Sequence, residues 1–422
     1  MFTTLRKAWK ITPLRNKILY TLLMILIFRL GANIPLPGID GQALSLAMAN
    51  TASEGVLGIF NLMSGDAFKR FSLFALGITP YITASIILNL LTVAIPYLER
   101  LAKQGLDGRK KIAQYTRYGT VIIALIQAYG FSYGIFLPYF KNPGFLSVTY
   151  AAIILTAGTA FLMYLGEHIT EKGIGNGISL FIFSGIIARL PSGTIDLIMR
   201  VKDGEVNIIS AILFVIVALF MVAGVIMITQ GMRKIPVQHA KRVVGRKMYG
   251  GQSTHIPLRV NQAGVIPVIF ATSILAIPSM IAGFMAADAG FRIWVGKWFA
   301  SSSWLFMIIQ FLLIIFFAYF YTSITFNPYE IAENLKKNGG FVPGIRPGKP
   351  TVEYIQRSVN RLILIGATCL GIIAVLPNIM MNFTPIRAAF GGTSLIIVVG
   401  VALETTRQIE AQMLMRNYKG FL

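Results

Sequence analysis

Charged residues are scarce in this sequence, and acidic ones are the scarcest. Only 13% of the 422 residues are Asp, Glu, Lys or Arg, whereas soluble globular proteins contain about 25%. Hydrophobic residues make up 55%, and apolar runs near 20 residues long recur along the chain. Because such runs are long enough to cross a bilayer, they exclude a soluble fold and predict an all-α polytopic membrane protein.

Cysteine and histidine are nearly absent as well. The single cysteine, Cys369, excludes a disulfide within the chain and a cysteine metal cluster. The three histidines, His168, His239 and His255, all fall between apolar runs. The chain contains no His-Glu-x-x-His, no Gly-x-Ser-x-Gly and no Walker motif. We therefore expect no catalytic residues, no metal and no cofactor, and any energy for transport would come from partners.

Ten apolar segments are candidate membrane spans. They lie at about 18–36, 71–95, 112–138, 148–166, 176–190, 207–230, 263–286, 303–325, 359–378 and 392–409. The first lacks a small-residue cleavage site, so we expect it to be a span and not a removed signal. The fifth is short and opens with a Gly-Asn-Gly sequence at Gly175.

Basic residues gather in alternate connections between these segments. The N-terminus and the connections after spans 2, 6 and 8 are rich in Lys and Arg, whereas Lys141 stands alone after span 3 and Arg387 alone after span 9. Because basic loops stay in the cytoplasm, we expect both termini there and an even number of spans. This distribution explains much of the net charge of +22 without nucleic acid.

Two basic connections, residues 231–260 and 326–358, are longer than orientation requires. Both are punctuated by glycine and proline. One interpretation is a solvated loop that only sets orientation. The other is a docking surface for a large cytoplasmic partner, since long loops in compact proteins often carry function.

A sequence pattern recurs in two distant spans. GITPYITASI begins at Gly77 and GVIPVIFATSI at Gly264, which aligns Pro80 with Pro267. A second repeated motif, Gly-x-Ser-Leu-x-Ile, begins spans 5 and 10. These pairs hold equivalent places in two sets of five spans, and an odd number makes the two halves insert with opposite orientations. Inverted repeats of this kind bracket a path at the bilayer midplane.

The repeated segments predict helices that bend and line this path. Proline removes a backbone donor and bends a helix, and small residues let helices approach closely; a purely structural kink is the alternative. Ionisable groups, which coupled transporters keep near the midplane, are almost absent from the spans. The lining candidates are isoleucines: Ile78, Ile82, Ile178, Ile182, Ile269 and Ile397. Such a ring can seal a pore by excluding water and can part around a passing chain.

Seven motifs resemble the SecY family, the central subunits of the bacterial protein-conducting channel. They are FRLGANIPLPGID (28–40), FALGITPYITASII (74–87), GRKKIAQYTRYGT (108–120), LGEHITEKGIGNGIS (165–179), GGQSTHIPLRVNQAGVIPVIFA (250–271), NPYEIAENLKKNGGFVPGIRPG (327–348) and GGTSLIIVVGVALE (391–404). The resemblance covers essentially all 422 residues. It implies an hourglass pore between pseudo-symmetric inverted halves, taken as 1–190 and 191–422, with the six isoleucines at the constriction.

The resemblance also implies three further sets of functional residues. A short plug helix at about 55–68 would close the outer side of the ring, with an interfacial helix as the alternative; its residues are Gly55, Gly58, Phe60, Asn61, Met63, Ser64 and Gly65. A lateral gate between spans 2 and 3 and spans 7 and 8 would be held by hydrogen bonds between helices, made by Thr83, Asn89, Thr272 and Ser273. The long basic connections would dock the SecA ATPase or the ribosome through Arg242, Arg246, Lys247, Arg346 and Lys349.

The predicted function is therefore transport of proteins and not catalysis. Unfolded polypeptides bearing signal peptides would cross the bacterial cytoplasmic membrane, and their apolar segments would leave sideways into lipid. The resemblance implies SecE, SecG, SecA and the ribosome as partners, and the predicted set also includes anionic lipids and a second copy of the chain. A secondary transporter or a membrane-embedded enzyme are the alternatives, but polar coordinating groups and a catalytic set are both lacking in the spans.

Overall fold

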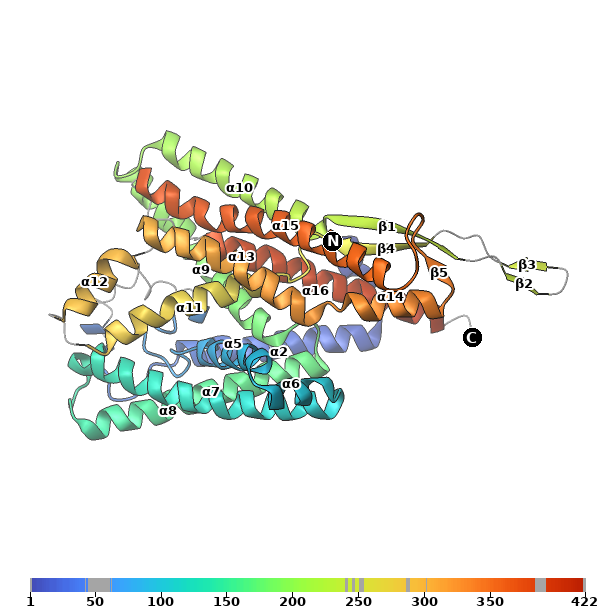
Figure 1. Ribbon diagram of the computed structural model, residues 1–422. Helices are drawn as coiled ribbons and strands as arrows, with labels where there is room; N and C mark the ends of the chain where they lie inside the picture. The colour runs from blue at the N-terminus through green and yellow to red at the C-terminus, as the bar shows by residue number, and fades with distance from the viewer. Residues whose placement is uncertain are drawn as a thin grey trace.

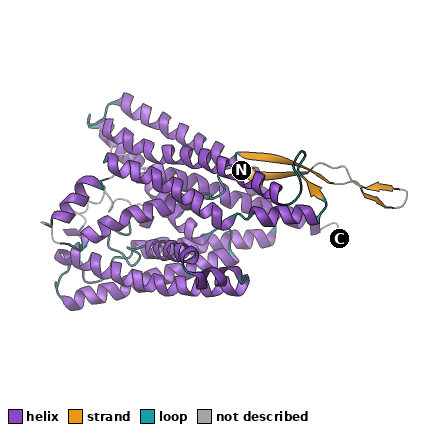
Figure 2. Ribbon diagram, in the orientation of Figure 1, coloured by secondary structure: helices purple, strands orange, loops and turns teal. Residues whose placement is uncertain are grey.

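The computed structural model describes residues 2–41, 43–44, 61, 63–239, 242–244, 247–249, 254–285, 289–300, 302–383 and 392–419. These residues form a bundle of long helices with a small β region projecting from one end (Figures 1 and 2). The first and last helices meet at a small apolar cluster that includes Ala8, Leu14 and Ile409. The first two helices and the last helix are therefore neighbours in the bundle.

The helices follow the predicted spans in order. The first set is α1 (Phe2–Trp9), α2 (Thr12–Asn33), α5 (Thr79–Ala94), α6 (Pro96–Lys103), α7 (Leu106–Gly134), the 3-10 turn η1 (Leu137–Tyr139), α8 (Phe145–Lys172) and α9 (Gly177–Lys202). The second set is α10 (Ile208–Gln230), α11 (Ile266–Gly283), α12 (Gly290–Trp298), α13 (Trp304–Thr325), α14 (Pro328–Lys337), α15 (Lys349–Phe383) and α16 (Gly392–Lys419). Helix α9 extends beyond the predicted fifth span, which was expected to end at residue 190. The predicted boundary between the two halves, at 190/191, therefore falls inside this helix.

Six of these helices are long and apolar enough to cross a membrane by length and composition alone. They are α8, α9, α10, α11, α13 with its continuation α14, and α15; the pair α5 and α6, bent by 100°, would be a seventh. Among the described helices, α2, α7 and α16 do not meet this criterion. Even so, α2 exposes Leu22, Leu26 and Leu30 along one face, which is the pattern of a lipid-facing helix.

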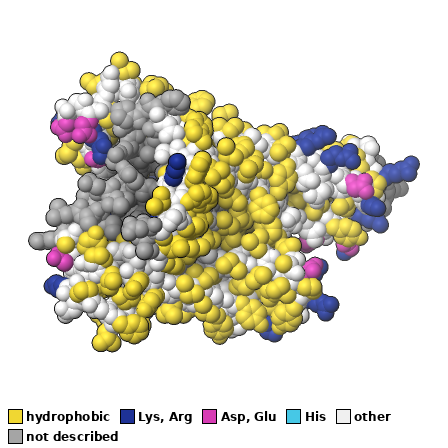
Figure 3. Space-filling view, turned by 60° about the vertical axis from the view of Figure 1, so that its left-hand side comes forward, with side chains coloured by type: hydrophobic (Ala, Val, Ile, Leu, Met, Phe, Trp, Pro, Cys, Tyr) yellow, Lys and Arg dark blue, Asp and Glu magenta, His cyan; other side chains and the backbone are white. Residues whose placement is uncertain are grey.

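The outer surface carries the same signature. Figure 3 shows apolar side chains over the middle of the molecule, with Lys and Arg side chains gathered at the end that carries the β strands. Exposed large hydrophobic side chains are numerous on α10 in particular, including Ile209, Ile216 and Phe220. A water-soluble surface does not sustain apolar area on this scale, so the mainly helical membrane class that the sequence predicted is supported.

The two Gly-x-x-Pro segments begin helices and do not bend them. Gly77 has a φ of +56° and Gly264 a φ of +65°, a left-handed conformation that glycine adopts without steric cost. Pro80 and Pro267 follow in the first turns of α5 and α11, where a missing N–H breaks no helical hydrogen bond. The prediction of kinks at these prolines is therefore wrong, as is the helix predicted across residues 71–78, which form turns. The two segments nevertheless share one local conformation.

The long basic connections contain regular structure. Strand β1 (Met232–His239) pairs with β4 (Thr254–Arg259) in an antiparallel ribbon, from Met232 opposite Arg259 to Val237 opposite Thr254. Strand β5 (Gly340–Phe341) adds to the other edge of β1. Strands β2 (Arg242–Val244) and β3 (Lys247–Tyr249) pair beyond the ribbon, and Figure 1 shows them farthest from the bundle.

This β ribbon is fixed to the helices through buried apolar side chains. Ile235 of β1 and Leu258 of β4 are fully buried in one cluster with Ile355 and Val359 of α15. The alternation of buried and exposed residues along β4 is typical of a strand with one face packed against a core. The strands β1 and β4 are thereby fixed to the helices at the base of this connection.

Candidate pore constriction and plug anchor

The six predicted pore-ring residues lie in or against one hydrophobic core of the bundle. Ile78, Ile82, Ile182, Ile269 and Ile397 are buried members of one hydrophobic cluster, and the half-buried Ile178 packs against it. They come from the start of α5 and from α9, α11 and α16. The exposed fractions of the five buried ones are between 0% and 5%. The six isoleucines therefore lie within or against one buried apolar core, and we call this core, with its isoleucines, the isoleucine cluster.

A cavity of about 180 Å³ borders this cluster on one side. Its lining includes four of the six isoleucines, Ile82, Ile178, Ile182 and Ile269, and two other apolar residues, Ile266 and Phe270. The polar lining residues are Tyr81, Ser85, Asn89, Asn176, Ser179 and Tyr321. Tyr321 lies in the last turn but one of α13, which leads to α14 and the β region. The cavity thus lies toward the end of the bundle that carries the basic strands.

The start of α9 is fixed by a side-chain cap. The Asn176 side-chain oxygen accepts hydrogen bonds from the backbone N–H groups of Ile178 (3.1 Å) and Ser179 (3.3 Å). Asparagine is among the preferred residues at this position because it satisfies donors that have no helical partner. The Gly-Asn-Gly sequence at the opening of the predicted fifth span is therefore a helix start that sets the position of Ile178 and Ile182.

The predicted gate hydroxyls bond within their own helices. Thr83 donates to the carbonyl of Thr79 (3.1 Å), and Ser273 donates to that of Ile269 (2.8 Å). Thr272 donates to the carbonyls of Val268 (3.1 Å) and Ile269 (2.9 Å). For these three residues the expected hydrogen bonds between helices are replaced by bonds within a helix, because a hydroxyl can donate to the second lone pair of the carbonyl one turn back.

Helices α5 and α11 do pack against each other. The hydroxyls of Thr83, Thr272 and Ser273 donate within their own helices and therefore do not donate across this contact. Asn89, the fourth residue of the predicted gate, is half-buried and lines the cavity beside the isoleucine cluster.

Part of the predicted plug lies against the isoleucine cluster. Met63 is 8% exposed and belongs to that cluster, while Asn61 and Ser64 are 1% and 2% exposed. Gly55, Gly58 and Phe60 lie outside the described residues. The end of the plug segment, residues 63–68, is thus buried in the centre of the protein.

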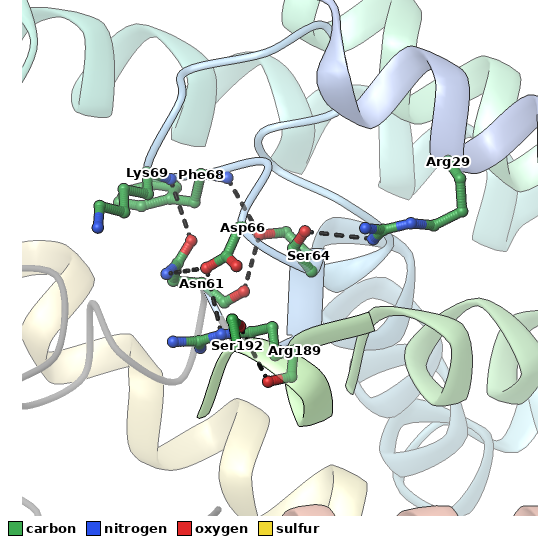
Figure 4. Close-up of polar contacts among 9 residues, drawn as sticks. Arg29, Asn61, Ser64, Asp66, Phe68, Lys69, Arg189 and Ser192 are labelled. Carbon is green, nitrogen blue, oxygen red and sulfur yellow. Dashed lines mark hydrogen bonds and ion pairs between the residues drawn. The ribbon is translucent and has the colours of Figure 1, made fainter. Parts of the chain in front are cut away.

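A set of polar contacts ties this segment to two helices (Figure 4). Arg189 of α9 places its Nε 3.2 Å from Oδ1 of Asp66, and the side chain of Asn61 donates to the same oxygen at 2.9 Å. From α2, Nη1 of Arg29 donates to the carbonyl oxygen of Gly65 at 3.2 Å. The Asn61 side-chain oxygen in turn accepts from the backbone N–H of Lys69 at 3.1 Å. We call Arg29, Asn61, Asp66 and Arg189 the polar anchor.

Sequence reasoning missed Asp66 and Arg189. Two charges in the sequence could have pointed to them: Asp66 at the edge of one apolar run and Arg29 inside another. Charged residues in such places usually have partners. Within the described ranges, no group of His, Cys, Asp or Glu side chains is arranged to hold a metal ion.

Close backbone packing supports the polar anchor. A Cβ atom on Gly65 would lie 2.8 Å from the Cα of Gly185, and a Cβ on Gly185 would lie 2.9 Å from the carbonyl oxygen of Met63. Both distances are shorter than real carbon contacts, so only glycine lets the plug segment lie this close to α9. Gly65 also has a φ of +64° and Asp66 a φ of +69°, which turns the chain sharply between the two helices.

Comparison with known proteins decides the family. A family model described as SecY matches residues 72–406. The chain belongs to the SecY family. It is 48% identical to the protein translocase subunit SecY of Halalkalibacterium halodurans, with 100% of both chains covered, and 42% identical to that of Thermotoga maritima, with 100% of this chain and 98% of the relative covered. The SecY family consists of translocation channel subunits, so the prediction that the chain is not an enzyme is confirmed.

Solved structures show the same fold. A SecY channel studied for its plug domain matches with a TM-score of 0.67 at 18% identity, covering 94% of this chain and 92% of that one. Sec61 in the canine ribosome-channel complex matches with a TM-score of 0.58 at 17% identity, with the same coverage. The predicted resemblance to the SecY family is therefore confirmed at the level of both sequence and fold.

The residues that the SecY resemblance implies for docking lie at the β end of the bundle. Arg346 and Lys349 are exposed just before and at the start of α15. Arg242 and Lys247 lie on β2 and β3, where the backbone alone is described, and Arg246 lies outside the described residues. The Thr351 hydroxyl donates to the carbonyl of Arg346 at 2.9 Å and holds that turn in place.

Proposed function

We propose that this chain is a protein-conducting channel whose constriction is the isoleucine cluster. The observation that carries the proposal is the convergence of six isoleucines from four helices, far apart in sequence, into one buried cluster with Met63 of the plug segment against it. Unfolded polypeptides bearing signal peptides would pass through this point. Because isoleucine side chains make no directional bonds, they can part around any sequence and close again afterwards.

We further propose ten membrane spans in two inverted halves, 1–190 and 191–422. Support comes from the correspondence between the ten apolar segments and ten long helices, and from the shared conformation of the two Gly-x-x-Pro segments. The proximity of α1 to α16, with the basic strands at one end, suits two cytoplasmic termini in the bacterial cytoplasmic membrane.

Lateral release of apolar segments would occur where α5 and α11 meet. Since Thr83, Thr272 and Ser273 bond within their own helices, separating the helices would break no hydrogen bond made by these hydroxyls. The gate would then be held by apolar packing, which lipid tails or an apolar signal peptide replace at little cost. A gate of this kind opens to hydrophobic segments and stays shut to polar ones.

The driving partners would bind at the basic end of the bundle. Exposed Arg346 and Lys349 and the strands that carry Arg242 and Lys247 suit the phosphates of a ribosome or the carboxylates of SecA. Ribosome docking is supported by the two ribosome-bound channels among the structural matches. SecE, SecG, anionic lipids and a second copy of the chain complete the proposed set of partners.

Site-specific photocrosslinking tests the proposed path. A photoreactive residue is placed at Ile82 or Ile269, and a secretory polypeptide is stalled in transit with SecA and ATP. We expect crosslinks from both positions and none from Phe220 on α10, which is 75% exposed and faces away from the bundle. Transit without a crosslink from either isoleucine would place the path elsewhere and overturn the proposal.

A further inference from the structure

We propose that the polar anchor holds the plug segment in the resting position and sets how readily the channel leaks and opens. This inference rests on the proposed function, because it concerns the regulation of the same constriction. It assigns Arg29, Asp66 and Arg189 as positioning residues, which act through the plug segment and touch no substrate in the closed state.

The charges of the anchor depend on one another. The Asp66 and Arg189 side chains are 30% and 20% exposed, so each charge is partly removed from water. Partly buried charges are costly unless they are paired and hydrogen-bonded. Asp66 lies among cations, with Arg29 and Arg189 on either side and Arg70 four residues on, which itself donates to Asn33 of α2. Loss of the Asp66 charge would therefore leave like charges facing one another.

The anchor joins two helices through two consecutive residues. Gly65 is held by Arg29 of α2, and Asp66 is held by Arg189 of α9. Both residues have left-handed backbone conformations, which aspartate and asparagine tolerate better than most side chains. If either helix shifts, the turn cannot keep both partners. A shift of α2 or α9 would consequently break at least one of the two contacts.

The anchor is also linked to the isoleucine cluster at both ends. On α9, Arg189 lies seven residues after Ile182, about two helical turns away on the same face. On the plug segment, Met63 of the cluster lies two residues before Gly65. Parting the cluster by moving α9 would pull Arg189 away from Asp66. Release of the plug segment and opening of the constriction would thus be one coupled step.

The proposal is tested by measuring resting ion permeability in proteoliposomes. These contain the purified channel with its partner subunits and no substrate. We expect Asp66→Asn, which keeps the left-handed turn but removes the charge, to raise permeability about threefold to fivefold. Arg189→Gln is expected to do the same, and the double variant is expected to exceed neither single variant, because both remove one shared interaction. Permeability like that of the unaltered protein, or effects that multiply in the double variant, would overturn the proposal.

A matched control lies on the same helix. Asp196→Asn removes an exposed ion pair with Arg200 on α9, 3.0 Å between Nε and Oδ2, and is expected to leave permeability unchanged. An Ile182→Asn variant serves as the leaking reference. If it leaks and the anchor variants do not, the anchor proposal fails alone; if it does not leak and the photocrosslinks are also absent, the proposed constriction fails.

A second variant replaces the ion pair of the anchor with a covalent link that can be cleaved. Cys369 is the single cysteine, so Cys369→Ser provides a background for Asp66→Cys together with Arg189→Cys. Joining the two thiols with a short cleavable crosslinker is expected to stop polypeptide translocation, and cleavage is expected to restore it. Translocation that continues at full rate with the crosslink complete would contradict the proposed release of the plug segment.

Discussion

Two kinds of contact close the centre of this molecule within about two helical turns of each other. The isoleucine cluster is apolar, buried and without directional bonds, whereas the polar anchor fixes Gly65 and Asp66 through charges and hydrogen bonds with defined partners. Apolar packing closes equally well around many shapes. Hydrogen-bonded ion pairs have one good geometry and are lost when that geometry changes.

The difference between the two contacts suits a channel with varied substrates. A seal that must reform around any polypeptide benefits from contacts that are indifferent to sequence, and the isoleucines provide this. A resting position that must be well defined benefits from contacts that are specific, and the anchor provides this. If the two contacts have these separate roles, the seal at the isoleucine cluster should be most sensitive to a change of side-chain polarity. The hold of the polar anchor on the plug segment should be most sensitive to a change of charge or of close packing.

The largest effect is expected from placing a polar group in the isoleucine cluster. Ile182 is fully buried, and an unpaired amide there costs about 1–3 kcal/mol and attracts water into the constriction. We expect Ile182→Asn to raise resting ion permeability about tenfold in proteoliposomes, since 1.4 kcal/mol corresponds to about a factor of ten. Ile182→Leu keeps volume and polarity and should leave permeability nearly unchanged. Equal permeability of the two variants would show that apolar exclusion is not what seals the pore.

A smaller effect is expected from disturbing the close fit beside the anchor. Gly185→Ala would place a Cβ atom 2.9 Å from the carbonyl oxygen of Met63, and overpacking of this kind costs about 1–3 kcal/mol. We expect faster thiol labelling of a cysteine at Met63, in a Cys369→Ser background, by about fivefold. Gly119→Ala is the matched control, because its Cβ would meet ordinary contact at 3.7 Å. Similar labelling in both variants would mean that the plug segment is not held by its fit to α9.

The sequence alone predicted the cluster better than the anchor, and for a physical reason. Repeated motifs and an unusual set of isoleucines identified Ile78, Ile182 and Ile397 as residues that the fold brings together, although their role as a pore ring stays a prediction. The pairing of Asp66 with Arg189 depends on how two distant segments pack, and no local pattern encodes it. Charges inside apolar runs indicate that partners exist but not which ones.

Local structure was also hard to predict where the chain is apolar throughout. Residues 71–78 contain one polar side chain, Ser72, so periodicity could not separate a turn from a helix, and the helix was placed too early. Strands β1 and β4 of the connection 231–260 pack against α15 through buried Ile235 and Leu258, which is a tertiary effect that no local pattern shows. The gate hydroxyls were assigned the wrong partners because a hydroxyl on a helix can bond to its own backbone or to a neighbour.

The smallest effect is expected from removing the gate hydroxyls. Thr83 and Thr272 donate to carbonyls of their own helices, so Thr83→Val and Thr272→Val remove no bond between α5 and α11. An average polar contact between membrane helices is worth roughly 0.6 kcal/mol, or about threefold, and because these hydroxyls donate to no neighbouring helix we expect a smaller change. Crosslinking of a signal peptide to α5 in the combined variant should therefore match the unaltered channel within that factor. A larger rise in crosslinking would mean that these hydroxyls hold the gate shut, and the gate would then resemble the polar anchor more than the isoleucine cluster.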